Sequence, residues 1–382
     1  MALLGGTQWG GTGGTALLGL LGGTGGTGGT GGTGGTGSLA DSFANPLVVQ
    51  ALMMSRDGTF ASDGPHHPPP DHGCLDNPTE LEHWDLWVRA ALVQAELNEG
   101  LTFAPQGPDT LVLKSGSTAW FSLTRPAPAF FAAQLPLVQS WATLREERMA
   151  EILTQIDNQI AFIAAITGLK ADRHRWTWEW LGAALSLVIA VEVRFKHALA
   201  CRRPVAYSPQ VQPIITTPGH GTYPMGHAAQ IYMLVEVLKV LLCRDRASAQ
   251  AVQLDRLAER VSVNRVVAGV HFPIDAHAGK ALGLAMARYF LGQCGLDAKQ
   301  VAHVEPGFGR ALGDPTSWDF PANKAATENP TPAEPPPSSA LMRRLTQLAL
   351  RELHVPCEDK ADPNPCQQTP CHCVSVPTPA AQ

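Results

Sequence analysis

Charged residues are scarce in this sequence, and positive charge is not in excess. Asp, Glu, Lys and Arg make up 16% of the 382 residues, hydrophobic residues make up 45%, and the net charge is −5 with histidine neutral. The chain therefore lacks the basic excess typical of proteins that bind nucleic acids or acidic membrane surfaces. We expect no nucleic-acid partner, and any anion site must come from a local cluster of cations.

Long charge-free apolar segments are also missing. A helix that spans a bilayer needs ~20 consecutive apolar residues, and the longest candidate, residues 181–200, contains Glu192, Arg194 and Lys196. No Lys or Arg occurs before Arg56, so the N-terminus lacks the basic region of a secretory signal. These absences predict a protein without a membrane span and with a cytoplasmic location.

The eight cysteines follow no single disulfide or zinc pattern. Four are far apart in the chain: Cys74, Cys201, Cys243 and Cys294. Scattered cysteines predict reduced thiols in a cytoplasmic protein. The other four lie between residues 357 and 373, near His372. Their irregular spacing favours an unstructured tail over the alternative of a metal or disulfide site.

Changes in composition divide the chain into three parts. A tandem Gly-Gly-Thr repeat and a Pro-rich segment cannot bury enough apolar surface to form a core, so residues 1–79 are expected to be disordered. Residues 80–321 form the predicted helical domain, with its core at 127–298. Residues 322–382 form a Pro- and Cys-rich tail with one short helix at 341–353.

The core of the domain has apolar residues at helical spacings of three and four. One such pattern runs for some ten turns over residues 130–169, with Pro136 as a kink or start and Gly168 as a stop. The other predicted helices cover residues 175–199, 226–242, 254–270 and 273–293. Alternation typical of strands is nearly absent, so the predicted fold class is all-α, a helical bundle.

Unusual polar residues occur at the ends of three of these helical segments. Lys196 and Arg203 are seven residues apart, which is two turns of a helix, so both cations are expected to point from one face. Taken alone, a solvent-exposed charged strip explains this pair better than a binding site does.

The second group is the stretch HGTYPMGHAAQ, residues 220–230. A Pro-Gly turn that leads into a helix leaves backbone N–H groups free to bind an anion, and Gly226 allows a close approach. His227 lies in the first turn of that helix and is expected to face the same pocket. A loop and a core helix with two incidental histidines explain the stretch equally well.

The third group is Arg265, His271 and Asp275. A carboxylate four residues beyond a histidine can accept its ring N–H and raise the basicity of the other nitrogen. Taken alone, a structural pair explains His271 and Asp275 equally well. All three groups together predict a pocket for a tetrahedral or trigonal-bipyramidal oxyanion. Its cations would neutralise oxygens, one histidine would attack the central atom, and the other would transfer a proton.

In chain order the groups read Lys-x6-Arg-Pro, Pro-x-Gly-His and Arg-x5-His-x3-Asp. They resemble the motifs of the type 2 phosphatidic acid phosphatase superfamily, which includes acid phosphatases and vanadium-dependent haloperoxidases. The resemblance implies a helical bundle of the acid phosphatase/vanadium haloperoxidase type. The segments NQIAFIAAITGL and RPVAYSPQ are similar to the soluble bacterial haloperoxidase-like branch.

The resemblance also implies which residues hold the oxyanion. Lys196, Arg203 and Arg265 would bind its oxygens, together with the backbone N–H of Gly226. His220 lies where algal bromoperoxidases have a histidine and fungal chloroperoxidases a phenylalanine, so it is expected at the cofactor and favours oxidation of bromide or iodide.

The remaining matches imply catalytic roles. His271 would be the axial residue, either the vanadium ligand of a peroxidase or the phosphoryl acceptor of a phosphatase. Asp275 would orient it, and His227 would be the acid–base group. The family normally has serine where this chain has Met225, and losing its hydrogen bond to a charged group costs about 1.5–3 kcal/mol.

The main prediction is a vanadate-dependent haloperoxidase that oxidises halide with hydrogen peroxide at vanadate bound to His271, with Lys196 activating the peroxide. Phosphate would occupy the same site, so one alternative is an acid phosphatase that acts on a small phosphoester through a phosphohistidine. Met225 supports a second alternative, a weakly active or inactive oxyanion-binding scaffold. Because related haloperoxidases form dimers or larger assemblies, a homo-oligomer is also expected.

Overall fold

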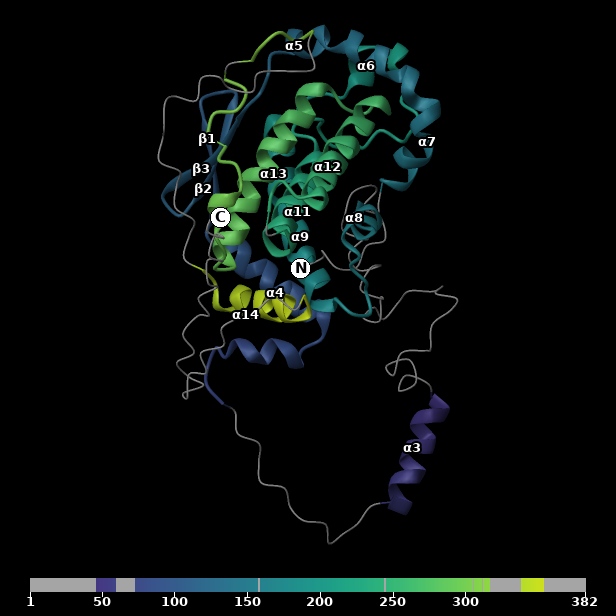
Figure 1. Cartoon of the computed structure of the whole chain (residues 1–382), viewed down its shortest axis with the longest axis vertical. Helices are drawn as coiled ribbons and strands as arrows, with labels where there is room; N and C mark the ends of the chain where they lie inside the picture. The colour runs from purple at the N-terminus through teal and green to yellow at the C-terminus, as the bar shows by residue number, and fades with distance from the viewer. Residues whose placement is uncertain are drawn as a thin grey trace, which may run out of the picture.

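The computed structural model describes residues 46–59, 73–156, 159–243, 245–304, 306–310, 312–316 and 338–353. Helices make up most of these residues and surround a central group of long helices (Figure 1). The prediction of an all-α helical bundle is therefore confirmed. A small sheet, which the sequence analysis did not predict, lies at one side of the bundle.

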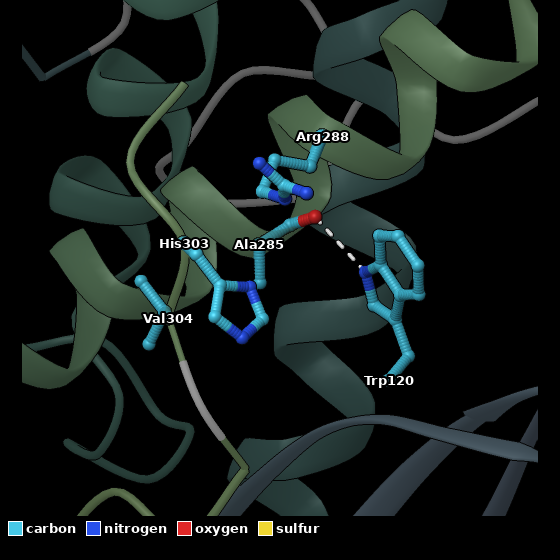
Figure 2. Close-up of a pocket in the computed structure, with 5 residues that line it drawn as sticks. All are labelled: Trp120, Ala285, Arg288, His303 and Val304. Atoms are coloured by element: carbon cyan, nitrogen blue, oxygen red, sulfur yellow. Dashed lines mark hydrogen bonds between the residues drawn. The ribbon is translucent and has the colours of Figure 1, made fainter. Parts of the chain in front are cut away.

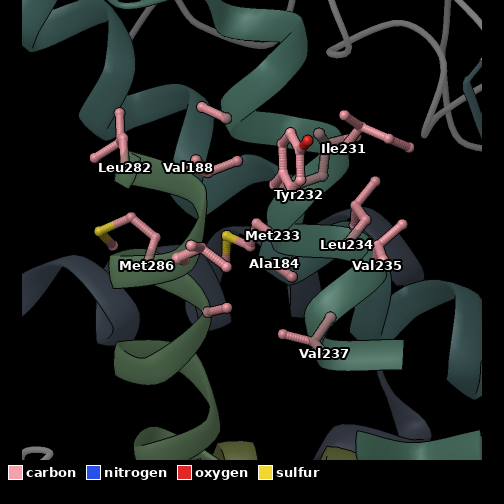
Figure 3. Close-up of a cluster of buried hydrophobic side chains, with 14 of the residues drawn as sticks. Ala184, Val188, Ile231, Tyr232, Met233, Leu234, Val235, Val237, Leu282 and Met286 are labelled. Atoms are coloured by element: carbon pink, nitrogen blue, oxygen red, sulfur yellow. The ribbon is translucent and has the colours of Figure 1, made fainter. Parts of the chain in front are cut away.

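Four long helices form the centre: α9 (Arg175–Leu199), α11 (Gly226–Leu242), α12 (Ala249–Val267) and α13 (Pro273–Gln293). The bounds of α9, α11 and α13 agree with the predicted ranges, and Pro273 occupies the first turn of α13. Apolar side chains of α9, α11 and α13 meet in the interior (Figure 3). This shared core fixes the ends of the helices, where the motif residues lie.

Two glycines allow α11 and α13 to pack closely. A Cβ atom added to Gly279 would lie 2.4 Å from the carbonyl oxygen of Met225, and one added to Gly283 would lie 2.6 Å from that of Ala229. No larger residue fits at either position without a shift of backbone. The N-terminus of α11 is therefore held against the first turns of α13.

The predicted ten-turn pattern at residues 130–169 is divided into short elements: α5 (Pro128–Ala133), α6 (Leu135–Trp141), η2 (Ala142–Leu144), α7 (Arg145–Thr154) and α8 (Gln159–Thr167). Pro136 has no N–H to continue α5, and it lies in the first turn of α6, which begins at Leu135. Gly168 has φ +72° and follows the end of α8, as predicted. The division leaves the C-terminal carbonyls of α7 free to accept hydrogen bonds.

The sheet consists of β1 (Leu101–Gln106), β2 (Thr110–Ser115) and β3 (Thr118–Thr124), antiparallel and in that order. Phe121 of β3 packs edge-on against Phe195 of α9, with ring centroids 5.8 Å apart. Several consecutive residues of β2 and β3 are buried, so the sequence lacks the alternation of apolar and polar residues that predicts a strand.

The remaining helical elements are α3 (Pro46–Thr59), η1 (Pro78–His83), α4 (Leu86–Glu99), α10 (Pro204–Tyr207), η3 (Pro209–Val211), η4 (Ala298–Gln300) and α14 (Ala340–Glu352). α3 lies within residues 1–79, where the sequence predicts disorder, and none of its residues is buried. The short C-terminal helix is present as α14 and packs on α9. Its Glu352 accepts hydrogen bonds from the N–H groups of Trp176 (3.0 Å) and Thr177 (2.9 Å), which stabilises the start of α9.

Cys201, Cys243 and Cys294 are free and buried. Cys74 is disulfide-bonded, so the prediction of reduced scattered thiols is wrong for this residue; spacing along a chain does not show which cysteines meet in space. The predicted Gly-Gly-Thr segment and Cys-rich tail lie outside the described residues. Within the described ranges, no helix is both long and apolar enough to cross a membrane.

Candidate active site

Lys196 and Arg203 do not lie on one helix. α9 ends at Leu199, Ala200 adopts a left-handed conformation with φ +49°, and Arg203 precedes the short helix α10 (Pro204–Tyr207). The prediction that both cations project from one helical face is therefore wrong, because the chain turns between them and Pro204 begins a new helix. They reach the same region from different elements.

His271 and Asp275 flank the start of α13. Oδ2 of Asp275 accepts hydrogen bonds from Nδ1 of His271 (3.0 Å), the N–H of Phe272 (2.8 Å) and Oγ1 of Thr222 (2.5 Å). Burial raises the pKa of Asp275 to about 6, although the hydrogen bonds from Thr222 and Phe272 act in the opposite direction. The contact that the four-residue spacing predicts is present, and Thr222 is a partner that the sequence analysis missed.

Arg203 fixes the tautomer of His271. Its NH1 lies 2.8 Å from Nε2 of His271 and also donates to the carbonyl oxygen of Val270. A guanidinium group only donates, so Nε2 carries a lone pair and Nδ1 carries the proton that Asp275 accepts. Burial, with the charges of Arg203 and Lys196, holds the pKa of His271 well below its usual value. His271 is thus a neutral imidazole whose lone pair is directed at a cation.

His220 lies at the solvent-exposed edge of this cluster. Its Nδ1 is 3.1 Å from NH2 of Arg203, and its carbonyl oxygen accepts a hydrogen bond from Nε of the same side chain at 3.1 Å. Partial burial and the charge of Lys196 lower the pKa of His220 to about 4. The neutral ring and the backbone of His220 thereby hold Arg203 beside His271.

Lys196 lies in the last turns of α9 and holds the loop before α11. Its Nζ donates to the carbonyl oxygens of Gly221 (3.3 Å), Thr222 (3.4 Å) and Pro224 (2.5 Å). Burial lowers the pKa of Lys196 to about 8. The ammonium group is therefore a buried cation next to the N-terminus of α11.

Arg265 and His227 lie on the side of the site formed by α7. NH2 of Arg265 donates to the carbonyl oxygen of Ile152 (2.8 Å), and Nε2 of His227 donates to that of Gln155 (3.1 Å). Burial lowers the pKa of Arg265 to about 10, and burial with the charge of Arg265 lowers that of His227 well below its usual range. Nε and NH1 of Arg265 have no hydrogen-bond partner in the described part of the chain.

Met225 precedes Gly226, the first residue of α11. It makes no side-chain cap, as expected for methionine, and its side chain belongs to the apolar core. Its backbone N–H donates to the carbonyl oxygen of Asp275 at 2.8 Å. The position of the turn is therefore fixed by the backbone although the serine hydroxyl of the family is missing.

Hydrogen bonds join four of the predicted site residues directly: Arg203, His220, His271 and Asp275. Lys196 holds the adjoining loop, and the charges of both Lys196 and His227 act on the pKa of His271. Among the described residues, no carboxylate lies within ion-pair distance of Lys196, Arg203 or Arg265. The site thus brings a neutral His271 together with the buried cations Arg203 and Lys196 at the ends of the bundle helices, an arrangement suited to a protein that binds an oxyanion.

A surface pocket elsewhere shares none of these residues. It is lined by Trp120, Ala285, Arg288, His303 and Val304, and Nε1 of Trp120 donates to the carbonyl oxygen of Ala285 at 2.9 Å (Figure 2). Ala285 is ten residues beyond Asp275 on α13, or about 15 Å along the axis. Within the described ranges, no group of three or more His, Cys, Asp or Glu side chains is placed to hold a metal ion.

Residues 177–294 match the family model described as the PAP2 superfamily. The match runs from the first turn of α9 to the end of α13 and contains every motif residue, so the motif-bearing part of the chain is similar to this superfamily. No curated protein matches the chain. One similar solved structure is a transmembrane PAP2-type phosphatidylglycerolphosphate phosphatase from Bacillus subtilis, 14% identical with a TM-score of 0.34, covering 56% of this chain and 93% of that one.

Proposed function

We propose that the protein is a phosphatase that hydrolyses a phosphomonoester through a phosphohistidine at His271. The observation that carries this proposal is the neutral His271, whose Nε2 lone pair faces Arg203 in a site where no carboxylate of the described residues lies within ion-pair distance of the cations. The similarity to the PAP2 superfamily supports phosphatase chemistry more than the peroxidase chemistry that the sequence analysis favoured.

The first step follows from the geometry around His271. Arg203, Lys196 and Arg265 bind the phosphoryl oxygens, which requires NH1 of Arg203 to leave Nε2 and turn to the substrate. Nε2 then attacks phosphorus, the bond to the ester oxygen breaks, and the imidazole becomes cationic. Asp275 stabilises that charge through the Nδ1 proton.

His227 supplies the proton for the leaving group. Its Nε2–H faces the carbonyl oxygen of Gln155 before substrate binds. A bound phosphoryl group places negative charge near the ring and raises its proton affinity, so the neutral ring takes up a proton from solvent and becomes the imidazolium that acts as general acid. The neutral ring left behind takes a proton from water, the water oxygen attacks phosphorus, and the P–N bond to His271 breaks to release phosphate.

His220 favours a second candidate, the vanadate-dependent haloperoxidase. It contacts Arg203 at the exposed edge of the site, the position at which the resemblance places a histidine in bromoperoxidases. Vanadate has the geometry of phosphate, and the unpartnered nitrogens of Arg265 and the lone pair of His271 fit it equally. Bound there, vanadate would supply Lewis-acid activation of hydrogen peroxide.

One preparation tests both candidates. The protein is purified without phosphate and assayed for hydrolysis of an aryl phosphate, and for bromination with peroxide after addition of orthovanadate. We expect hydrolysis and an acid-labile phosphoenzyme, both lost in His271→Gln and retained in His197→Gln, which changes an exposed histidine of α9. Bromination without hydrolysis would contradict the phosphatase and support the peroxidase. Neither activity, with phosphate binding retained, would support the oxyanion-binding scaffold.

A further inference from the structure

α9 carries a buried carboxyl group that the mechanism above does not use. Glu192 lies one turn before Lys196 and is only 1% exposed. A Cβ atom added to Gly226 would lie 2.5 Å from Oε1 and 2.9 Å from Oε2 of Glu192. The carboxyl group therefore lies directly against the first residue of α11, at the place where backbone N–H groups are free to bind an anion.

The hydrogen bonds of Glu192 are incomplete. Oε1 accepts a single bond from Nε2 of Gln230 at 3.3 Å, and Oε2 has no partner among the described residues. Lys196 does not pair with it, because Nζ of Lys196 donates to carbonyl oxygens of residues 221–224. A buried carboxyl oxygen without a partner is costly, so a ligand group that completes its hydrogen bonds would stabilise the site.

The surroundings of Glu192 favour its protonated form near neutral pH. Burial raises its pKa to about 7, and the charges of Lys196 and Arg203 act in the opposite direction. Lys196 belongs to α9 itself and Arg203 precedes α10, whereas α11 contributes Gly226 and Gln230, which do not titrate. A proton on Glu192 removes one negative charge beside the N-terminus of α11; Asp275 of α13, whose carbonyl oxygen accepts the N–H of Met225, carries the other titratable carboxyl group there.

We propose that Glu192 is a further residue of the oxyanion pocket and that it binds the oxyanion in protonated form, donating its carboxyl O–H to an oxyanion oxygen beside Gly226. An ionised Glu192 would instead repel the oxyanion and compete for the same helix N-terminus. Binding at a pH where Glu192 is ionised therefore takes up one proton from solvent. The inference rests on the proposed function only in requiring that the pocket binds oxyanions.

Sulfate is the suitable probe, because its charge does not change between mildly acidic and mildly basic pH, so any pH dependence belongs to the protein. Sulfate affinity is measured by calorimetry for the wild type and for Glu192→Gln, which mimics the protonated side chain. The matched control is Glu179→Gln, a buried carboxylate on the same helix that pairs with Arg89. Circular dichroism and thermal unfolding verify that each variant is folded.

We expect Glu192→Gln to bind sulfate as the wild type does at about pH 6 and up to about tenfold more tightly at about pH 8, since each required proton changes affinity tenfold per pH unit. Glu179→Gln should follow the wild type. A decline at high pH that all three proteins share reports Lys196, whose pKa is about 8.

Infrared difference spectra give a second, independent measurement. Adding sulfate to the wild type at about pH 8 should produce the C=O band of a protonated carboxylic acid, present in Glu179→Gln and absent in Glu192→Gln. The inference is overturned if sulfate binds to the wild type without producing this band and Glu192→Gln has the pH profile of the wild type. The proposed function would then still stand. Absence of sulfate and phosphate binding in every protein at both pH values overturns both.

Discussion

The two ends of α11 both bury charged side chains, but they arrange them differently. At the C-terminal end, Nζ of Lys239 lies 2.7 Å from Glu236 and 2.5 Å from Asp255, and NH1 of Arg246 lies 2.5 Å from Glu236. Each cation there contacts a carboxylate. Such a network links α11 to α12 and to the loop between them, and its role is structural.

At the N-terminal end the cations meet mostly backbone carbonyl oxygens and the lone pairs of His220 and His271. Arg265 donates only to Ile152, Lys196 donates to the loop before α11, and Glu192 keeps one oxygen without a partner among the described residues. Buried charge that is left unpaired costs stability unless a ligand completes it. The comparison supports the proposal that an oxyanion binds at the unpaired end, and each prediction below tests that difference.

The largest effect is expected from replacing a cation at each end by methionine. Arg265→Met should lower kcat/KM for an aryl phosphate by about a hundredfold, the value of one or two hydrogen bonds to a charged group. It should leave the unfolding temperature unchanged or raise it, because a buried cation without a carboxylate partner is removed. Activity assays and thermal unfolding measure the two effects.

Lys239→Met is the matched control at the other end. It leaves Glu236 paired with Arg246 and should lower stability by about 1–3 kcal/mol while kcat/KM changes less than twofold. If Arg265→Met destabilised the protein as much as Lys239→Met and kept its activity, the two ends would not differ in the way described.

The second prediction concerns the contact that holds the N-terminal end in place. In Gly279→Ala the new methyl group would lie 2.4 Å from the carbonyl oxygen of Met225 and 2.7 Å from Cβ of Ala228. We expect a loss of about 2 kcal/mol in the free energy of unfolding and a fall in kcat, because α11 must move away from His271.

Gly100→Ala is the control for this substitution, since its Cβ atom would meet only the hydroxyl of Tyr289 at 3.6 Å. Urea unfolding and steady-state kinetics on both variants give the comparison. A Gly279→Ala protein with the stability and kcat of the wild type would show that the close packing of α11 on α13 does not position the site.

The third prediction is a pH dependence of stability. Burial raises the pKa of Glu192 from 4.5 in the unfolded chain to about 7 in the folded protein. The folded protein therefore binds more protons between these values, and the contribution of Glu192 to stability falls as pH rises through this range. Glu192→Gln lacks this fall.

Glu192→Gln should therefore gain stability relative to the wild type as pH rises from about 5 to about 8. We expect a gain of about 1–3 kcal/mol in the free energy of unfolding, measured as a growing difference between the two unfolding temperatures. His271 and His227, whose pKa values are lowered, act in the opposite sense but equally in both proteins. A constant difference across the range would show that the carboxyl group does not titrate there.

Sequence patterns were sufficient for the long helices and for the contact between His271 and Asp275, because both depend on residues close in the chain. The start of α13 at Pro273 and the end of α8 at Gly168 follow from local backbone preferences. The predicted placement of Lys196 and Arg203 on one helical face was wrong, because helical spacing was applied across Ala200 and Pro204, where the helix had ended.

The missed features depend on contacts between distant segments. The carbonyl oxygens of Ile152 and Gln155 become partners of Arg265 and His227 only once α7 packs against α12. Thr222 has a short side chain whose partners no spacing specifies. Glu192 did carry a signal, a charge inside an apolar helix one turn before Lys196, which the sequence analysis used only to exclude a membrane span.

The smallest effect is expected from Met225→Ser, which introduces the residue found at this position in the superfamily that the motifs resemble. Met225 is fully buried, so serine loses about 1.5–3 kcal/mol of apolar burial. The hydroxyl at this helix N-cap position returns about 0.5–2 kcal/mol, leaving a net loss of about 1 kcal/mol. Because the hydroxyl can also donate to the oxyanion, sulfate affinity should rise several-fold. Met233→Ser is the control, because it creates a similar cavity in α11 away from the helix N-cap. It should lose more stability and gain no sulfate affinity. Equal sulfate affinities in the two variants would contradict a role for residue 225 in binding the anion.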